Sequence, residues 1–117
     1  MKMQYITMMV RDINRSLRFY QELVGLNIAK RFNPGNCEIA FLENNPGETM
    51  VELVQLEGRR AAVDGLVISF HAGEAVDAIW EKARAMGYAP TEIYDNGPKP
   101  RYFHVADPDD VMIEFIV

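Results

Sequence analysis

Two glutamates stand inside apolar segments, where an ionisable carboxylate is unexpected. Glu52 lies in "TMVELVQL" and Glu114 lies in "VMIEFIV". Because side chains alternate along a strand, Met50 shares a face with Glu52 and Met112 shares a face with Glu114, and the opposite faces are also apolar. An unpaired carboxylate in such surroundings is costly, so each needs a partner or a proton. Candidate partners are a metal ion, an Arg or Lys, a Tyr hydroxyl, or the companion glutamate sharing one proton.

The spacing of the two glutamates belongs to an internal repeat. Glu52 and Glu114 lie 62 positions apart, and so do Gly25 and Gly87, each of which ends a predicted helix. Equal offsets at two landmarks indicate a duplication. The duplication favours a shared functional pocket over two purely structural carboxylates bonded to a tyrosine or to backbone amides.

The sequence predicts the same order of elements in each half. An apolar stripe formed by Ile13, Leu17, Tyr20 and Val24 predicts the first helix, with Asp12 as its N-cap. In the first half, the predicted elements are a strand at 5–10, a helix at 11–25 and strands at 26–32, 37–43 and 49–56. In the second half, they are a strand at 66–72, a helix at 73–87 and strands at 88–94, 101–106 and 111–117. Pro90 weakens the prediction of the strand at 88–94.

This order predicts an α+β fold of two tandem β-α-β-β-β modules, at about 1–57 and 64–117, within a single domain. The segment "EGRRAAVD" is the predicted connector. A sheet of three or four strands must cover one of its faces. We therefore expect the modules to dock within one chain or to swap in a symmetric dimer.

Composition excludes several classes of function. The chain has 117 residues, of which 49% are hydrophobic and 25% charged, and its net charge is -5, as in an ordinary globular domain. No cluster of Lys and Arg suggests nucleic-acid binding, and no apolar run is long enough for a membrane span. Cys37 is the only cysteine, so an intramolecular disulfide is excluded. Together with the lack of a signal-peptide pattern, this predicts a cytoplasmic protein.

Two motifs resemble those of a known superfamily. "VRDINRSLRFYQELVGL" resembles the first strand-helix signature of the vicinal oxygen chelate superfamily, and "DPDDVMIEF" resembles its closing DPDG-x-x-IE signature. That superfamily includes glyoxalase I, bleomycin-resistance proteins, extradiol dioxygenases and fosfomycin-resistance enzymes. The resemblance covers essentially the whole chain and implies a glyoxalase-like fold whose curved sheets enclose a cleft. It is specific for the fold and poorly specific for activity.

The resemblance also implies positions for a metal site. In glyoxalase I-like members, a residue on the first strand and a glutamate on the last strand of each half hold the metal. The glutamates match Glu52 and Glu114, the predicted catalytic and metal-binding residues. The first-strand positions fall at Tyr5 and near Gly65 or Leu66, so both family histidines are missing. Such a partial site suits a harder divalent ion such as magnesium or manganese, and it argues against a dioxygenase, which needs two histidines and a carboxylate.

The predicted cleft is lined by aromatic, methionine and polar side chains. His104 is a candidate ligand or general base, and the simpler interpretation is a hydrogen-bonded surface residue. Arg101, together with Lys99, could hold an anionic group at the rim, against the simpler interpretation of a solvated loop. The methionines suit a loosely shaped ligand or simply fill a core. The predicted ligand-binding residues are Tyr5, Met50, Met112, Tyr102, His104 and Arg101, with Met9 and Phe41 beside them.

Three functions fit these residues. The first is a metal-dependent lyase or isomerase similar to glyoxalase I, in which a glutamate of raised pKa acts as general base and a divalent metal stabilises an enediolate. The second is a metal-free protein that binds an antibiotic or metabolite, as bleomycin-resistance proteins do. The third is a protein-interaction or structural role with a vestigial cleft. For the first two, the expected partners are a small-molecule ligand and a second copy of the chain in a homodimer.

Overall fold

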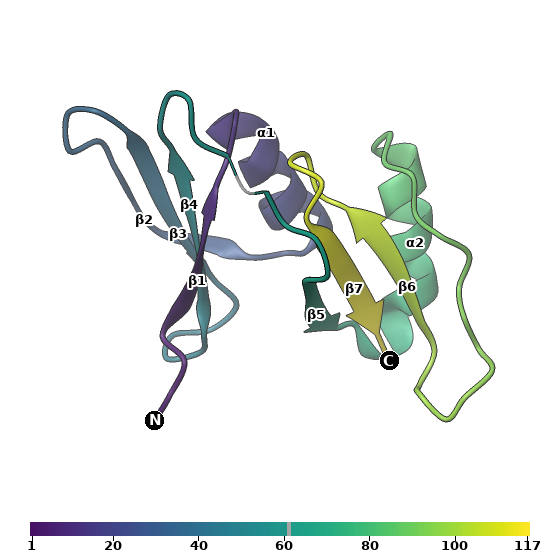
Figure 1. The fold of residues 1–117 in the computed structure, drawn as a ribbon. Helices are drawn as coiled ribbons and strands as arrows, with labels where there is room; N and C mark the ends of the chain where they lie inside the picture. Colours follow the sequence, from purple (N-terminus) through teal and green to yellow (C-terminus); the bar gives the residue numbers. More distant parts are fainter. Residues whose placement is uncertain (61) are drawn as a thin grey trace. The chain divides into compact units, whose positions relative to one another are not determined.

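The chain folds into two compact units, Met1–Ala62 and Val63–Val117. The computed structural model describes residues 1–60 and 62–117. In Figure 1 the first unit runs from purple to teal and the second from teal to yellow. The described elements form the α+β fold that the sequence predicts. Among the described residues, no helix combines the length and apolar character that crossing a membrane requires.

The first unit has the predicted β-α-β-β-β order. Its sheet runs β1-β4-β3-β2, with β1 parallel to β4 and the other neighbours antiparallel. A π-helical turn, η1, continues α1. The elements are β1 (Tyr5–Met9), α1 (Ile13–Leu17), η1 (Arg18–Leu23), β2 (Asn27–Phe32), β3 (Glu38–Glu43) and β4 (Met50–Gln55).

The start of α1 is fixed by two side chains. Asp12 Oδ1 accepts hydrogen bonds from the backbone N–H groups of Asn14 (3.0 Å) and Arg15 (3.3 Å), as an N-cap does. The N–H of Ile13 donates to Gln55 Oε1 at 2.7 Å, which ties the helix to the end of β4. The helical segment ends before Gly25, whose φ of 86° is accessible to glycine at little cost.

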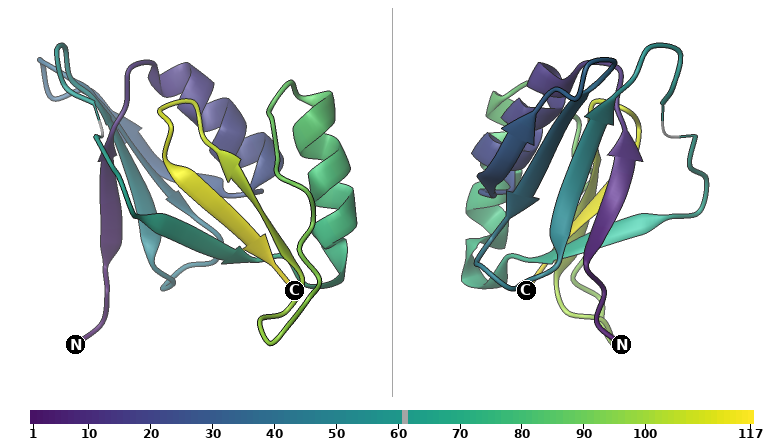
Figure 2. Two further views of the ribbon diagram at one scale, coloured as in Figure 1. Left: turned by 45° about the vertical axis from the view of Figure 1, so that its right-hand side comes forward. Right: turned by 90° about the vertical axis from the view of Figure 1, so that its left-hand side faces the viewer.

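The second unit repeats the plan with one strand fewer. Its sheet runs β5-β7-β6, with β5 parallel and β6 antiparallel to β7. A short 3₁₀ turn, η2, leads into α2, which packs against β6 and β7 and lies along their sheet (Figure 2). The elements are β5 (Val67–His71), η2 (Gly73–Ala75), α2 (Val76–Ala85), β6 (Tyr102–Ala106) and β7 (Met112–Ile116).

The predicted strand at 88–94 is wrong. That segment pairs with β6 only through an isolated bridge between Tyr94 and Tyr102. Pro90 has no N–H to give to a ladder. Beside it, the N–H of His104 donates to the side-chain Oγ1 of Thr91 at 3.0 Å rather than to a backbone carbonyl. Three backbone bonds remain: Thr91 N donates to the His104 carbonyl at 2.8 Å, and Tyr94 and Tyr102 exchange two bonds at 2.8 and 3.2 Å. The segment therefore follows β6 without forming a strand.

The turn before β7 is built by a buried aspartate. Asp107 is 4% exposed, and its Oδ1 accepts hydrogen bonds from the N–H groups of Asp109 (2.8 Å) and Val111 (3.0 Å). Asp110 has a φ of 66°, a left-handed conformation that Asp tolerates better than most residues. It occupies the place where the resembling signature has glycine. The turn thus sets the register in which β7 presents Glu114.

Phe103→Ala should destabilise the second unit strongly. Phe103 is fully buried and its ring lies 5.2 Å from that of Phe115. Loss of such a side chain leaves a cavity and costs about 3–5 kcal/mol. Urea unfolding followed by circular dichroism measures the change. Val63→Ala removes an exposed side chain and should shift the free energy of unfolding by no more than about 0.5 kcal/mol. Equal losses for the two variants would contradict this description of the core.

Candidate functional site

Glu114 is a buried carboxylate with three side-chain partners. It lies on β7 and is 3% exposed. Its Oε1 accepts a hydrogen bond from Ser69 Oγ at 2.8 Å. Its Oε2 lies 2.5 Å from Lys99 Nζ and 2.9 Å from His104 Nε2. We call Ser69, Lys99, Tyr102, His104 and Glu114 the Glu114 cluster.

The sheet register brings most of this cluster together. Ser69 on β5 and His104 on β6 are the direct cross-strand neighbours of Glu114 on β7, so all three side chains project from one face. The opposite face of β7 carries buried Ile113 and Phe115, which supply the apolar core. The sequence of the three strands therefore places a polar row on one face and the core on the other.

Lys99 reaches the cluster from the loop that precedes β6. Its Nζ lies 4.3 Å from the centroid of the Tyr102 ring, within the range of a cation–π interaction. The Tyr102 ring in turn lies 5.3 Å from the His104 ring. Lys99 is thus half-exposed on its loop, and its ammonium group contacts the buried carboxylate.

Glu114 is ionised at neutral pH. Burial is the largest single effect and raises its pKa. The hydrogen bonds from Lys99, His104 and Ser69, together with the positive charge of Lys99, outweigh burial and hold the pKa of Glu114 below its ordinary value. The expectation of a glutamate with a raised pKa acting as general base therefore fails for Glu114. A carboxylate of lowered pKa is better suited to orienting its neighbours than to removing a proton.

The ionised carboxylate fixes the hydrogen-bonding state of His104. A carboxylate can only accept, so the His104 Nε2 that contacts it carries the hydrogen. In the neutral imidazole the other nitrogen, Nδ1, is then an acceptor. The His104 side chain is 26% exposed, which leaves part of the ring accessible to a ligand. His104 thus has the geometry of a histidine oriented by a carboxylate.

Arg101 is held elsewhere. Its two terminal nitrogens donate to the carboxylate of Asp77 on α2 at 3.1 and 2.9 Å, and its Nε lies 3.4 Å from Asp95. Hydrogen bonds from Arg101 lower the pKa of Asp77. The structure thus joins Arg101 to the helix, whereas Lys99 contacts Glu114. A ligand-binding role for Arg101 stays a prediction and is not used below.

The first unit carries a simpler version of this arrangement. Glu52 on β4 is half-buried, and the hydroxyl of Thr7, its neighbour on β1, donates to Glu52 Oε1. On its other side the neighbour of Glu52 is Phe41 on β3, where the second unit has His104. Tyr5, which is 45% exposed, packs edge-on against Phe41 with ring centroids 5.2 Å apart. Met50 lies beside Tyr5 in the register.

The residues around Glu114 do not fit a resident divalent metal. In the part of the chain that the structure describes, no three His, Cys, Asp or Glu side chains are grouped as metal ligands. Near Glu114 the available metal-ligand groups are its own carboxylate and the imidazole of His104. The ammonium group of Lys99 already contacts Glu114 Oε2, the same oxygen that His104 contacts. Joint metal binding by Glu52 and Glu114 stays a prediction.

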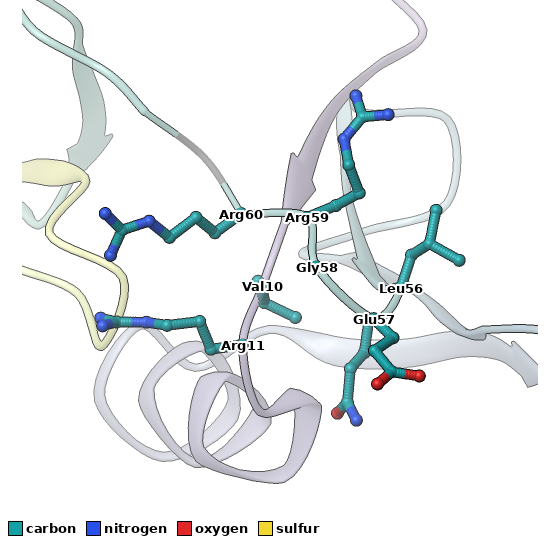
Figure 3. A pocket seen from close by; sticks show the side chains of 8 residues that line it. Val10, Arg11, Leu56, Glu57, Gly58, Arg59 and Arg60 are labelled. Atoms are coloured by element: carbon teal, nitrogen blue, oxygen red, sulfur yellow. The ribbon is translucent and has the colours of Figure 1, made fainter.

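A separate pocket opens at the ends of β1 and β4 in the first unit. It has a volume of about 570 Å³. Figure 3 shows the Arg11 and Arg60 side chains extending in one direction and Arg59 in another. The pocket contains none of the predicted site residues, and most of its lining residues are exposed, unlike those of a typical ligand pocket. Its lining residues are Val10, Arg11, Gln55, Leu56, Glu57, Gly58, Arg59 and Arg60.

Glu114→Gln should reduce the acid sensitivity of stability. A lowered folded-state pKa means that the carboxylate stabilises the fold fully above 4.5, the ordinary value, and that this contribution is lost as the pH falls through the folded-state pKa. Near neutral pH the variant should lose about 1–3 kcal/mol, because the ammonium group of Lys99 loses its charged acceptor.

Urea unfolding over a pH series measures this effect. The difference between wild type and Glu114→Gln should shrink as the solution is acidified. Glu81→Gln is the matched control because Glu81 is exposed on α2, and it should leave the pH profile unchanged. A constant difference between wild type and Glu114→Gln across the acid range would rule out the charged state assigned to Glu114.

Several solved structures have the same fold and superpose on nearly the whole chain. The antibiotic-binding protein TnmS3 from Streptomyces sp. CB03234 superposes with a TM-score of 0.79 at 21% identity, covering 99% of this chain and 94% of that one. The trypanothione-dependent glyoxalase I of Leishmania major gives a TM-score of 0.80 at 22% identity, covering 99% and 86%. A glyoxalase/bleomycin resistance protein/dioxygenase domain from Frankia sp. EAN1pec gives 0.82 at 21% identity, covering 100% and 97%. At these identities the similarity shows a shared fold.

Sequence comparison identifies the family. The uncharacterized protein YwbC of Bacillus subtilis (strain 168) is 34% identical over 123 residues, which covers 97% of this chain and 95% of YwbC. The family model of the Glyoxalase/Bleomycin resistance protein/Dioxygenase superfamily matches residues 2–115. The chain therefore belongs to the Glyoxalase/Bleomycin resistance protein/Dioxygenase superfamily, as its two motifs indicate.

Proposed function

We propose that this chain binds a small organic molecule and does so without a resident metal ion. The observation that carries the proposal is that Glu114, at the position of the superfamily's metal-binding glutamate, is neutralised within the chain. Lys99 supplies the positive charge at 2.5 Å, and His104 and Ser69 supply further hydrogen bonds. The charge requirement of the buried carboxylate is thereby met by protein side chains.

The face that carries the Glu114 cluster also offers contact surface for a ligand. Tyr102, His104, Met112 and Ile116 are all half-buried and share the face of β6 and β7 with Glu114. Flat rings and an adaptable methionine beside a few polar groups are typical of sites for small organic molecules. In the first unit, Tyr5, Phe41 and Met50 give a mainly apolar counterpart. The fold shared with an antibiotic-binding protein supports this class of function.

A homodimer in the cytoplasm is part of the same proposal. Tyr5, Leu66 and Val67 are large apolar side chains that are each more than two-fifths exposed. They belong to or adjoin the edge strands β1 and β5. Burial of such side chains against a second copy of the chain would remove apolar surface from water.

A lyase or isomerase is the second candidate, and the geometry of His104 favours it. Glu114 holds Nε2–H of His104, so Nδ1 is free to accept a proton from a carbon acid. The ammonium group of Lys99 lies in the same cluster and could hydrogen-bond a developing oxyanion. In this version His104 is the base, and Glu114, predicted as catalytic, is a positioning residue. The fold shared with a glyoxalase I supports the class.

Ligand screening tests the binding proposal. Metabolites and cationic antibiotics that bind should raise the melting temperature of the protein, and hits should be confirmed by calorimetric titration. Met112→Ala should weaken binding of a confirmed hit about tenfold or more, since covering a methionine side chain with a ligand contributes about 1.5–3 kcal/mol. Met3→Ala, which alters an exposed methionine, should leave affinity unchanged. If no compound stabilises the protein at millimolar concentration, the binding proposal fails.

Turnover of the hemithioacetal of methylglyoxal and glutathione tests the second candidate. His104→Gln should abolish turnover while ligand affinity changes much less, because the substitution removes a proton acceptor. The reaction is followed by formation of the thioester product. Absence of turnover in the wild-type protein, with or without added divalent metal, would leave binding as the function.

A further inference from the structure

We propose that Lys99 is a built-in cation that closes a latent metal site formed by Glu114 and His104. Removal of its ammonium group should therefore give the protein an affinity for divalent transition metals that the wild-type chain lacks. The proposal concerns the ion rather than the organic ligand. It can accordingly fail while small-molecule binding stands, and the reverse also holds.

The first support is the contact itself. Of the three side chains that contact the Glu114 carboxylate, Lys99 is the one that brings an ammonium group, and at 2.5 Å it is also the nearest. Such a charge offsets part of the cost of burying the ionised carboxylate. An ammonium ion and a divalent metal would compete for the same oxygen, because two cations cannot share it without strong repulsion.

The second support is the spacing of the two donors beneath the ammonium group. Glu114 Oε2 and His104 Nε2 lie 2.9 Å apart. Zinc binds nitrogen and oxygen ligands at about 2.0–2.2 Å in a tetrahedral arrangement, so two ligands of one ion lie roughly 3.4 Å from one another. The imidazole and the carboxylate are therefore near the separation of a ligand pair, and a small rotation of the imidazole would turn its Nε2 lone pair from Glu114 toward an ion. Metal binding would require His104 Nε2 to lose its hydrogen.

The third support is the way Lys99 is held. Its ammonium group also lies over the Tyr102 ring, so an aromatic face and a carboxylate both fix it. The side chain is 49% exposed, so it reaches the cluster from the solvent side. Replacing it removes a group that lies above the donor pair and leaves the three-stranded sheet beneath intact.

Lys99 also has hydrogen-bond donors available for a bound ligand. An ammonium group has three donor hydrogens, and the described residues provide Lys99 with one hydrogen-bonding partner, Glu114. The remaining donors can bind an oxygen atom of a bound molecule. A carbonyl, carboxylate or enolate oxygen is the chemistry that fits, since it would meet a positive charge that Glu114 holds in place.

Cobalt titration of the full chain tests the proposal. Wild-type protein and Lys99→Met should be titrated with CoCl₂ and followed by the visible absorption of bound cobalt, with ZnCl₂ calorimetry as a second measurement. Lys99→Met should bind at least tenfold more tightly than the wild-type protein. Lys99→Arg retains a cation and should behave like wild type. Lys82→Met removes an exposed lysine of α2 and is the control for loss of one charge.

Further variants identify the ligands. Adding His104→Ala or Glu114→Gln to Lys99→Met should abolish the gained affinity and the nitrogen-ligand contribution to the cobalt spectrum. Lys99→Gln is the alternative if Lys99→Met unfolds, as judged by circular dichroism. Stoichiometric binding by the wild-type protein at the affinity of Lys99→Met would overturn the proposal. So would a folded Lys99→Met or Lys99→Gln that gains no affinity over Lys82→Met.

Discussion

Neutralisation of the Glu114 carboxylate is the constraint that organises the second unit. The carboxylate is buried on the central strand of a three-stranded sheet, and each neighbouring strand supplies one hydrogen-bonding side chain, Ser69 and His104. The loop before β6 supplies the charge through Lys99. Two residues further on, Arg101 is bound to Asp77 of α2. The beginning of β6 is thus held by one cation to the polar face of the sheet and by another to the helix.

The two halves of the duplication share the hydroxyl neighbour of the glutamate and differ in its other cross-strand neighbour. A hydroxyl faces the glutamate from the first strand in both, Thr7 for Glu52 and Ser69 for Glu114. On the other neighbour strand, one half has Phe41 and the other has His104. One unit therefore presents a mainly aromatic surface and the other an ionic one.

The sequence predicted what depends on periodicity and missed what depends on loop conformation. Alternation placed Glu114 and Met112 on one face, and the helical stripe located the first helix, because both follow from local geometry. The strand at 88–94 failed since a side-chain bond from His104 to Thr91 replaced part of the ladder. The hydroxyl pair Thr7 and Ser69 could have been predicted, because the two residues have the same 62-residue spacing as the glutamates. The contact of Lys99 with Glu114 could not have been predicted, because the path of a loop follows no periodic pattern in the sequence.

A lysine in place of a metal changes what the site can do. A metal ion binds an oxygen directly and stabilises charge on it as a Lewis acid, whereas an ammonium group offers only hydrogen bonds and a single charge. The charge of Lys99 is also shared with Glu114, since the two lie 2.5 Å apart. A site of this kind can hold and orient an oxygen atom, but stabilises an enediolate less than a divalent ion does. For this reason binding is our first proposal and isomerisation the second. In the second, His104 is the base, and Glu114 keeps its imidazole in one tautomer.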